Sequence, residues 1–375
     1  MATLAPIGER PLLVATLLLV VFAALLAQAY FRPFTADLTV DSYSYYYGAK
    51  ALAEGLDPYD TEVIQELAPK RLGFVFPYLY PPLLAMMWRP LLALSPESAH
   101  DVTVFLSGLL AILNVGLIWR LARPSTRAAG WLVVFILAQL VCGPLISTLR
   151  LGQVNTLVVT LVLSALLFER DGEPILTGFL LALAILLKVT PFVFLVDFVL
   201  RRRWRSLFST LFFTGGIAGA TSLWTGVGPW IAFAKRTLEP LPFHPPMSLD
   251  GLLAAVGRSI GLPRPFVLII VIAGLTVLLV RLAIRLPALR EEYGSPVAGW
   301  CMLIFFSLLA FPLTWHHHYY LTLLPFAYFV FRADSGVTKA SLAIWLFLAA
   351  AVLLRYPGDL HPIKPIAALI AFLLI

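Results

Sequence analysis

Asp41 is the first residue of this sequence whose type and surroundings suggest chemistry. It opens the segment DSYSYYYGAK, in which four tyrosines follow closely. A carboxylate within hydrogen-bond reach of a hydroxyl can take its proton as that hydroxyl attacks, so Asp41 is a candidate general base. Aspartate at the start of a helix is also a preferred N-cap. The two roles are compatible, because a carboxylate has two oxygens.

Tyrosines and amides are the next candidates. Most tyrosines of the segment fit an aromatic belt at the lipid headgroups. Tyr45 and, further along, Tyr80 are candidate substrate contacts, since a tyrosine ring offers an apolar face and a hydroxyl. Gln153 and Asn155 stand close together in a chain poor in amides. Hydrogen bonding between helices explains them most simply, and contact with a substrate is the alternative.

His316, His317 and His318 form the most conspicuous polar run of the chain. Consecutive residues of a helix point about 100° apart, so three neighbours do not share one tetrahedral metal face. A cluster at the membrane interface is one interpretation. The other is that His317 or His318 donates a hydrogen bond to an anionic group that gains charge during a reaction.

Three further cations lie in or beside apolar runs, namely Arg150, Lys188 and Arg258. Ionisable groups at such positions are costly and usually face a cavity or a partner. Arginine offers a fork that fits phosphate oxygens, whereas lysine is a point charge. All three are therefore candidates for binding a phosphate. Lys188 could instead form a structural ion pair with Asp197 or Asp41.

The elements that must position these residues lie in a membrane. The 375-residue chain is 60% hydrophobic and only 13% charged, whereas soluble domains are about half apolar and a quarter charged. The net charge of +7 does not indicate nucleic-acid binding, because the basic residues lie in short clusters between apolar runs. The sequence predicts an all-α polytopic membrane protein that forms one integral membrane domain over residues 1–375.

About twelve apolar runs approach the length that a helix needs to cross the hydrocarbon. The first, Pro11 to Phe31, resembles a signal peptide but is longer than a usual one, which favours a retained span. The later candidates are 98–119, 128–149, 153–168, 174–187, 189–200, 206–226, 265–286, 296–314, 317–331, 340–355 and 362–375.

The distribution of Lys and Arg predicts the orientation. With the N-terminus inside, the inner loops hold the clusters at 120–127 and 201–205, and the inner set outnumbers the outer one. Both termini are then cytoplasmic, and the long loops 32–97 and 227–264 lie outside. We expect the 201–205 cluster, RRRWR, to contact lipid headgroups.

The first outer loop is expected to contain short helices. One begins at Asp41 and is stopped by Gly55 and Asp57-Pro58. Residues 61–72 form a second. FPYLYPPLLAMMWRPLLALS forms a third, which we expect to lie in the membrane interface because a crossing here would place the Arg120–Arg127 cluster outside.

Six segments in this order resemble glycosyltransferase family 87 of the GT-C superfamily, the polyprenyl-phosphate-mannose-dependent mannosyltransferases. They are DSYSYYYGAKALAEGLDPYD, YLYPPLLAMMWRPLLAL, LGQVNTLVVTLVLSALL, GFLLALAILLKVTPFVFLVDFVLRRRWR, MSLDGLLAAVGR and FPLTWHHHYYLTLLP. Two positions depart from the family pattern. Pro246-Met247 stands where Asn-Gln is usual, and His316 replaces an acidic residue.

The resemblance implies a GT-C fold and an inverting transfer of a hexose, mannose by family, from a polyprenyl monophosphate to a lipid or glycan hydroxyl. It implies a site at the outer face of a bacterial cell membrane, with Asp41 as the base. The donor phosphate would lie near His317, His318, Arg258, Lys188 and Arg150. The first outer loop has no Asp-x-Asp pair, so we expect no metal. The sequence also has no glycine-rich phosphate loop, so we expect no cofactor.

A transporter or flippase of a lipid-linked or small solute is the alternative function. Its signature would be an inverted repeat with broken helices in corresponding halves, and we find no such repeat. A transporter also has less use for a long structured loop that carries carboxylates on one side. A non-catalytic scaffold would leave the grouped Asp, His and Arg residues unexplained.

Overall fold

The computed structural model describes residues 11–31, 40–122, 129–239, 247–333, 339–354 and 362–375. These residues form helices and connecting turns, without a strand among them. Three residues that the sequence analysis singled out, Arg123, Arg127 and Pro246, lie outside the described ranges. The all-helical prediction is confirmed for the described parts of the chain.

The first half of the chain contains α1 (Pro11–Phe31), α2 (Asp41–Ala53), α3 (Thr61–Leu67), η2 (Lys70–Leu72), α4 (Pro82–Trp88), η3 (Arg89–Ala93), α5 (Pro96–Ala122), α6 (Ala129–Ala138), η5 (Gln139–Val141), α7 (Gly143–Leu151) and α8 (Asn155–Asp171). The second half contains α9 (Pro174–Leu187), η6 (Thr190–Val193), α10 (Phe194–Leu200), α11 (Trp204–Thr225), α12 (Gly228–Leu238), α13 (Leu249–Ser259), α14 (Arg264–Tyr293), α15 (Val297–Ala310), η7 (His316–Thr322), α16 (Leu323–Ala333), α17 (Lys339–Leu353) and α18 (Ile363–Leu374).

Three of these helices, α5, α11 and α14, are long and apolar enough to cross a membrane. A fourth crossing is possible if α6–η5 and α7 form one span that bends by 49°. The most apolar stretch of α14 is only 22% buried inside the protein and that of α11 only 17%. Apolar helices that expose this much surface need lipid around them, so the chain is a polytopic membrane protein.

The twelve spans expected from the sequence are not all long helices. Predicted span 174–187 is α9, and 189–200 is the short η6 followed by α10. Predicted span 317–331 opens with the 3₁₀ helix η7 before α16 begins. Such broken segments are tolerated at membrane depth where they are buried in protein or line a cavity. The count of twelve and the GT-C fold stay predictions.

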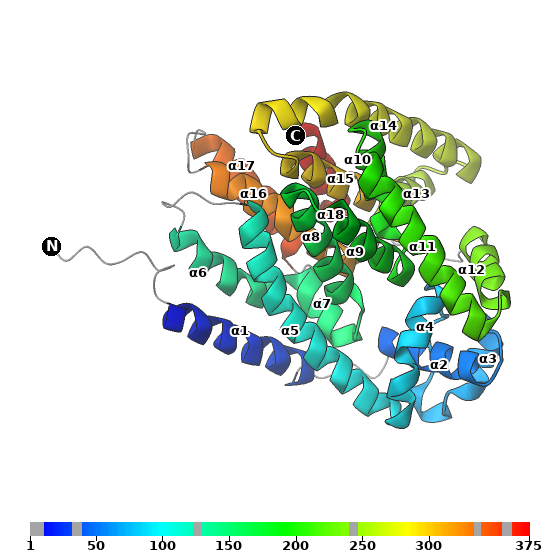
Figure 1. Cartoon of the computed structure of the whole chain (residues 1–375). Coiled ribbons are helices and arrows are strands. Elements are labelled where there is room, and N and C mark those ends of the chain that lie inside the picture. The colour runs from blue at the N-terminus through cyan, green and yellow to red at the C-terminus, as the bar shows by residue number, and fades with distance from the viewer. Residues whose placement is uncertain (1–10, 32–39, 123–128, 240–246, 334–338, 355–361) are drawn as a thin grey trace.

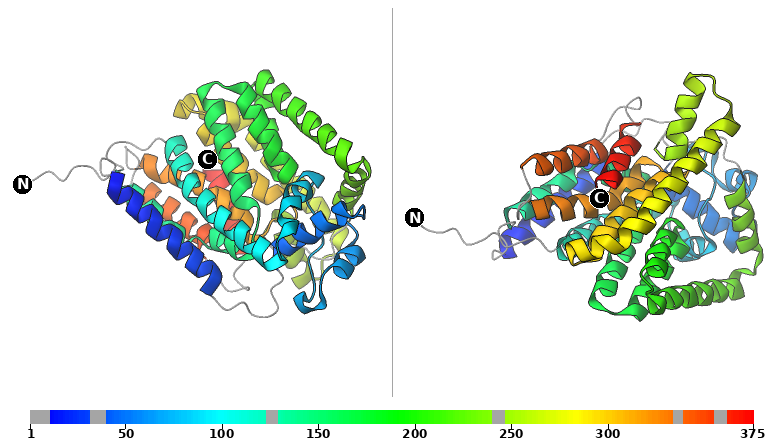
Figure 2. Two further views of the ribbon diagram at one scale, coloured as in Figure 1. Left: turned by 60° about the horizontal axis from the view of Figure 1, so that its bottom comes forward. Right: turned by 90° about the horizontal axis from the view of Figure 1, so that it is seen from above.

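The first loop contains the predicted short helices. Helices α2, α3 and α4 gather at one end of the bundle, and α12 packs against α4 (Figure 1). Tyr59 of the loop meets Phe233 of α12 with ring centroids 5.9 Å apart. In Figure 1, α14 runs along the top of the molecule, and in the view from above it therefore crosses in front of the other helices (Figure 2, right). Parts of the chain far apart in sequence therefore build one end of the bundle.

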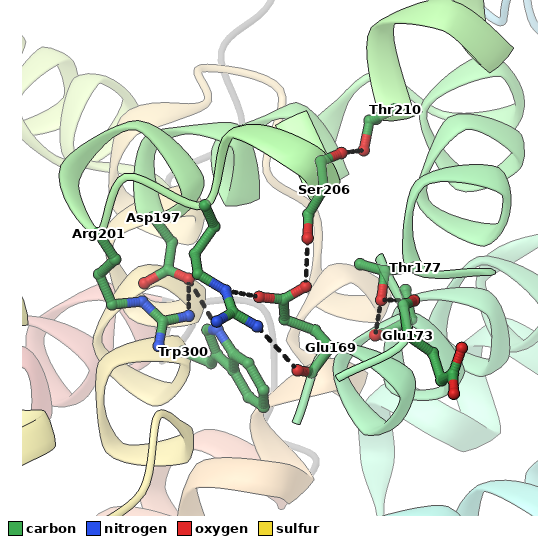
Figure 3. A network of polar contacts seen from close by, with 10 residues as sticks. Glu169, Glu173, Thr177, Asp197, Arg201, Ser206, Thr210 and Trp300 are labelled. Carbon is green, nitrogen blue, oxygen red and sulfur yellow. Dashed lines mark hydrogen bonds and ion pairs between the residues drawn. The ribbon is translucent and has the colours of Figure 1, made fainter. Parts of the chain in front are cut away.

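Near the C-terminal end of α8, two carboxylates are each paired with an arginine (Figure 3). Glu169 accepts hydrogen bonds from Arg203 Nε at 2.6 Å and Ser206 Oγ at 2.5 Å. Asp197 accepts from Arg201 and from Trp300 Nε1, the latter at 3.0 Å. Because Asp197 pairs with Arg201, it is not the partner of Lys188. This network ties α8, α10, α11 and α15 together.

Gly178 lets α9 and α11 approach closely. A Cβ built at this position would lie 2.3 Å from Ser209 Oγ and 2.6 Å from the backbone nitrogen of Thr210. A side chain could avoid this contact by changing its rotamer, but the backbone of α11 could not. The sequence places glycine here because any side chain would push the two helices apart.

Replacing Gly178 by alanine should therefore destabilise the bundle. We expect Gly178→Ala to cost about 1–3 kcal/mol, the range for overpacked cores, and to lower the melting temperature followed by circular dichroism in detergent. Gly216→Ala is the matched control, since a Cβ on Gly216 of α11 meets nothing within 4 Å. Its melting temperature should be unchanged or slightly higher, because alanine favours helix. Equal melting of both variants would contradict this account of the contact.

Candidate functional site

Asp41 lies in the first turn of α2 but does not cap the helix. The N-cap residue is Val40, and no side chain caps it. The Oδ2 atom of Asp41 instead accepts a hydrogen bond from Nε2 of Gln153. The carboxylate is thus directed across the chain to a residue 112 positions away, and the capping interpretation of Asp41 is wrong. Asp41 as a whole residue is partly exposed.

Gln153 is held by a tight turn and by two tyrosines. It follows Gly152, which ends α7 in the left-handed conformation with φ of +63°. A Cβ on Gly152 would lie 2.8 Å from Cβ of Ser42, the residue next to Asp41. The Oε1 atom of Gln153 accepts hydrogen bonds from the hydroxyls of Tyr45 at 2.7 Å and Tyr80 at 3.2 Å.

Burial changes the ionisation of Asp41. Loss of water around the carboxyl group raises the pKa of Asp41 from 3.8 to about 6. The hydrogen bond from Gln153 and the positive charge of Lys188 act in the opposite direction and limit the rise. Burial also raises the pKa of Tyr45 and Tyr80, so both hydroxyls keep their protons and can donate.

Lys188 occupies the break between α9 and η6. Its side chain is buried, and Nζ donates a hydrogen bond to Asn155 Oδ1 at 2.6 Å. Nζ also lies 5.7 Å from the centroid of the Tyr80 ring, within range of a cation–π contact. Among the described residues, no carboxylate forms an ion pair with Lys188. The alternative of a structural pair with Asp197 or Asp41 is therefore not what the geometry shows.

A cavity of about 50 Å³ lies beside Lys188. Its polar lining includes Lys188, Asn155, Thr314, His317 and His318. Val158, Val159 and Val162 continue the wall along α8, together with Ile304, Leu308 and Leu321 from other elements. Since a helix rises 1.5 Å per residue, the apolar wall extends about 10 Å along α8 from Asn155. Thr190 and Ser307 also line the cavity, so its wall combines polar and apolar side chains.

The two later histidines enter this cavity from η7. Their rings meet edge to face with centroids 4.4 Å apart. The Nδ1 atom of His318 accepts a hydrogen bond from the backbone N–H of Trp315 at 2.9 Å. In the neutral ring the proton is then on Nε2, which is a donor. Sequence reasoning grouped these histidines but had no way to assign this tautomer.

A buried polar cluster supports η7. Asn114 Oδ1 accepts from Thr160 Oγ1 at 2.9 Å, and Asn114 Nδ2 lies 3.5 Å from the hydroxyl of Tyr320. Tyr319 donates to the backbone carbonyl of Met247 at 2.7 Å. These bonds fix the histidine segment against α5 and α8. The sequence analysis missed Asn114 and Thr160, because lone polar side chains in apolar runs carry no signal of their partners.

The remaining predicted cations are placed differently. Arg150 lies in the last turn of α7, two residues before Gly152, and is partly buried. Arg258 is exposed near the end of α13 and does not line the cavity. The structure thus brings Lys188, His317, His318 and Asn155 together, with Asp41, Tyr45, Tyr80 and Gln153 adjoining them. It does not bring Arg258 to them.

Comparison with known proteins gives one family. The sequence model of glycosyltransferase family 87 matches residues 78–312. This range contains Gln153 and Lys188, whereas Asp41, His317 and His318 lie outside it.

Curated relatives agree with the family match. A polyprenol-phosphate-mannose-dependent alpha-(1-2)-phosphatidylinositol mannoside mannosyltransferase of Mycolicibacterium smegmatis is 29% identical over 66% of this chain and 60% of its own length. A protein of the same name from Mycobacterium tuberculosis is 28% identical over 88% of this chain and 78% of its own. A polyprenol-phosphate-mannose-dependent alpha-(1-2)-phosphatidylinositol pentamannoside mannosyltransferase of M. smegmatis is 29% identical over 93% of this chain and 83% of its own length.

Infrared titration of Asp41 tests the environment described here. The folded protein should hold a proton on Asp41 between pH 3.8 and about 6, where an exposed aspartate has lost it. We expect a carboxylic-acid band that grows as the pH falls through about 6 and is missing in Asp41→Asn. Glu66→Gln, which changes an exposed carboxylate of α3, should leave this band in place. A band assigned to Asp41 that appears only near pH 4 would contradict the burial argument.

Proposed function

The chain belongs to glycosyltransferase family 87, and from this premise we propose that it transfers mannose from a polyprenyl monophosphate to a hydroxyl of a lipid or glycan. The family assignment favours the enzyme over the transporter. The printed names of the relatives specify a polyprenol-phosphate-mannose donor and phosphatidylinositol mannoside acceptors. Those substrates are the first to test here.

The cavity beside Lys188 is the observation that carries the proposal. A polyprenyl phosphate has an anionic head and a long apolar tail, and the cavity wall offers both cationic or hydrogen-bonding side chains and apolar ones. An ammonium group buried without a carboxylate is costly, and a phosphate would supply the missing negative charge. The Nε2–H of His318 would donate to a phosphate oxygen as the leaving group gains charge.

Asn155 gives independent support for an acceptor-rich ligand in the cavity. Its Oδ1 accepts from Lys188, which orients its amide nitrogen. This Nδ2 is buried and has no acceptor among the described residues. Buried donors are nearly always satisfied in folded proteins. A phosphate oxygen in the cavity would complete this hydrogen bond.

Asp41 is the proposed general base. Gln153 occupies Oδ2, which leaves Oδ1 to accept a proton from the attacking hydroxyl. With a pKa of about 6, most of the Asp41 population is ionised at neutral pH. The positive charge of Lys188, which acts on Asp41, also connects the base to the proposed phosphate site.

The reaction is a single inverting displacement. The acceptor oxygen forms a bond to the anomeric carbon while the bond from that carbon to the phosphate oxygen breaks. The hydroxyl proton goes to Asp41, and the polyprenyl phosphate leaves with the electron pair. The transition state is oxocarbenium-like, as in glycosidases. An alpha product formed by inversion requires a beta-linked donor.

The site is proposed to face the outside of the cell membrane. Asn155 and Lys188 lie at one end of α8, and Glu169 with Arg203 lies at the other. The arginine-rich segment 201–205 marks the inner side by the positive-inside rule. The multi-pass chain would then have cytoplasmic termini and the first loop outside. Tyr80, partly exposed beside Lys188, is the best placed of the predicted substrate contacts.

Asp41→Asn should abolish most of the transfer. Loss of a general base typically costs about 10²- to 10⁴-fold, and we expect that loss in kcat with purified protein, polyprenyl-phosphate mannose and a phosphatidylinositol mannoside. Wild-type kcat/KM should rise with pH through about 6, as Asp41 loses its proton, and then level off. Glu66→Gln serves as the exposed-carboxylate control and should keep full activity. Transfer that survives in Asp41→Asn removes Asp41 as the base.

Lys188→Gln should weaken use of the donor. Glutamine can still donate to Asn155 but carries no charge, so the variant isolates the attraction to phosphate. We expect a fall of about 100-fold in kcat/KM for the donor and little change in KM for the acceptor. The assay is run at pH 7, where most of Asp41 is ionised and a buried ammonium keeps its charge better than at higher pH. Lys235→Gln, at an exposed lysine of α12, is the matched control. Equal kinetics of both variants would argue against a phosphate at Lys188.

A further inference from the structure

We propose that Gln153 is a positioning residue for Asp41, and that Tyr45 acts on the reaction only through Gln153. The proposal rests on the function above, in which Asp41 is the base. Gln153 would hold Oδ2 so that Oδ1 faces the acceptor hydroxyl. Neither Gln153 nor Tyr45 would touch a substrate.

Hydrogen-bond chemistry fixes the direction of this network. An ionised carboxylate only accepts hydrogen bonds, so the NH₂ group of Gln153 must be the side that faces Asp41. The carbonyl Oε1 then faces the tyrosines, and both hydroxyls must donate to it. The donors therefore run in one direction, from the tyrosines through Gln153 to Asp41.

The burial of Gln153 and Tyr45 favours a positioning role over direct contact with a substrate. Gln153 is 2% exposed and Tyr45 is 0% exposed. The Tyr45 ring packs edge to face against Tyr80 and Trp88, with centroids 4.8 and 5.2 Å away. Asp41 is a partly exposed residue, so an acceptor that approaches from water would meet Asp41 before these two buried side chains.

The backbone also holds Gln153 in register with α2. The N–H of Gln153 donates to the carbonyl of Thr148 at 2.9 Å. Ser42, the residue after Asp41, bonds to Nδ1 of His100 at 2.7 Å, and both groups lie against Gly152. Asp41 and Gln153 are thus fixed relative to each other by the residues adjoining them in sequence.

Removing the amide should change both the orientation and the acidity of Asp41. The other groups that face Asp41 are Lys188, Tyr45 and Tyr80, while His100 on α5 is bonded to Ser42. Lys188 and the amide of Gln153 both favour the ionised carboxylate. With the amide gone, Asp41 binds its proton more tightly, and the acid limb of the rate profile moves to higher pH.

The test compares Gln153→Ala with wild type in the mannose-transfer assay across pH. Misplacing a reacting group by about 1 Å can cost about 100-fold. We therefore expect kcat to fall about 10- to 100-fold, KM for both substrates to change little, and the acid limb to shift upward. Gln139→Ala is the control, because Gln139 is a buried amide that bonds within its own segment, to the Phe135 carbonyl. The acid limb of the pH–rate profile of Gln139→Ala should coincide with that of wild type.

Tyr45→Phe is the second variant, since it keeps the ring and removes only the hydroxyl bonded to Gln153. It should show a smaller fall in kcat and a shift of the limb in the same direction. An unshifted limb in both Gln153→Ala and Tyr45→Phe overturns the proposal, as does a rise in KM with unchanged kcat. If wild type transfers mannose and the variants match it, the positioning role alone is lost. If wild type fails with every polyprenyl-phosphate sugar, the proposed function is lost as well.

Discussion

The hydrogen bond from Gln153 to Asp41 connects two parts of the molecule that lie far apart in sequence. Asp41 belongs to a short helix of the first loop, and Gln153 belongs to the turn that separates α7 from α8 inside the bundle. A loop helix of this length has little stability of its own. It is held by contacts such as the close approach of Ser42 to Gly152. The position of the carboxylate therefore depends on the packing of α2 against the bundle, and so does any chemistry that uses it.

The second constraint is the buried cation. Lys188 interrupts an apolar segment, and its nearest polar partner is an amide oxygen rather than a carboxylate. Hydrogen bonding to Asn155 satisfies one donor and leaves the charge uncompensated. A cavity between Lys188 and the histidines gives an anionic ligand room to approach. The break at Lys188 and the 3₁₀ turn at the histidines are irregular for the same reason, since regular helices would not turn these side chains into one cavity.

Much of this could be predicted from local sequence, and the rest depends on distant contacts. The helix that begins at Asp41 was predicted from its boundary signals, but its cap is Val40. Lys188, His317 and His318 were grouped with Arg150 and Arg258 through the resemblance to the family, and Arg258 does not line the cavity. The link from Asp41 to Gln153 spans 112 residues, and no periodicity encodes such a pairing. Lys364 shows the same limit. It is fully buried and donates to the carbonyls of Val352 and Leu354, at the end of α17.

The two ends of α8 show how charge pairing separates scaffold from site. At one end, Glu169 is bonded to Arg203 and Ser206, and Asp197 is bonded to Arg201 and Trp300. Each carboxylate there has its own cation, which is how buried charges are tolerated in a structural network. At the other end, the carboxylate of Asp41 is bonded to an amide, and the ammonium of Lys188 is bonded to another amide. Keeping these opposite charges apart costs stability that a direct ion pair would have recovered. In the proposed mechanism, this separation leaves Asp41 free to take a proton and Lys188 free to hold an anion.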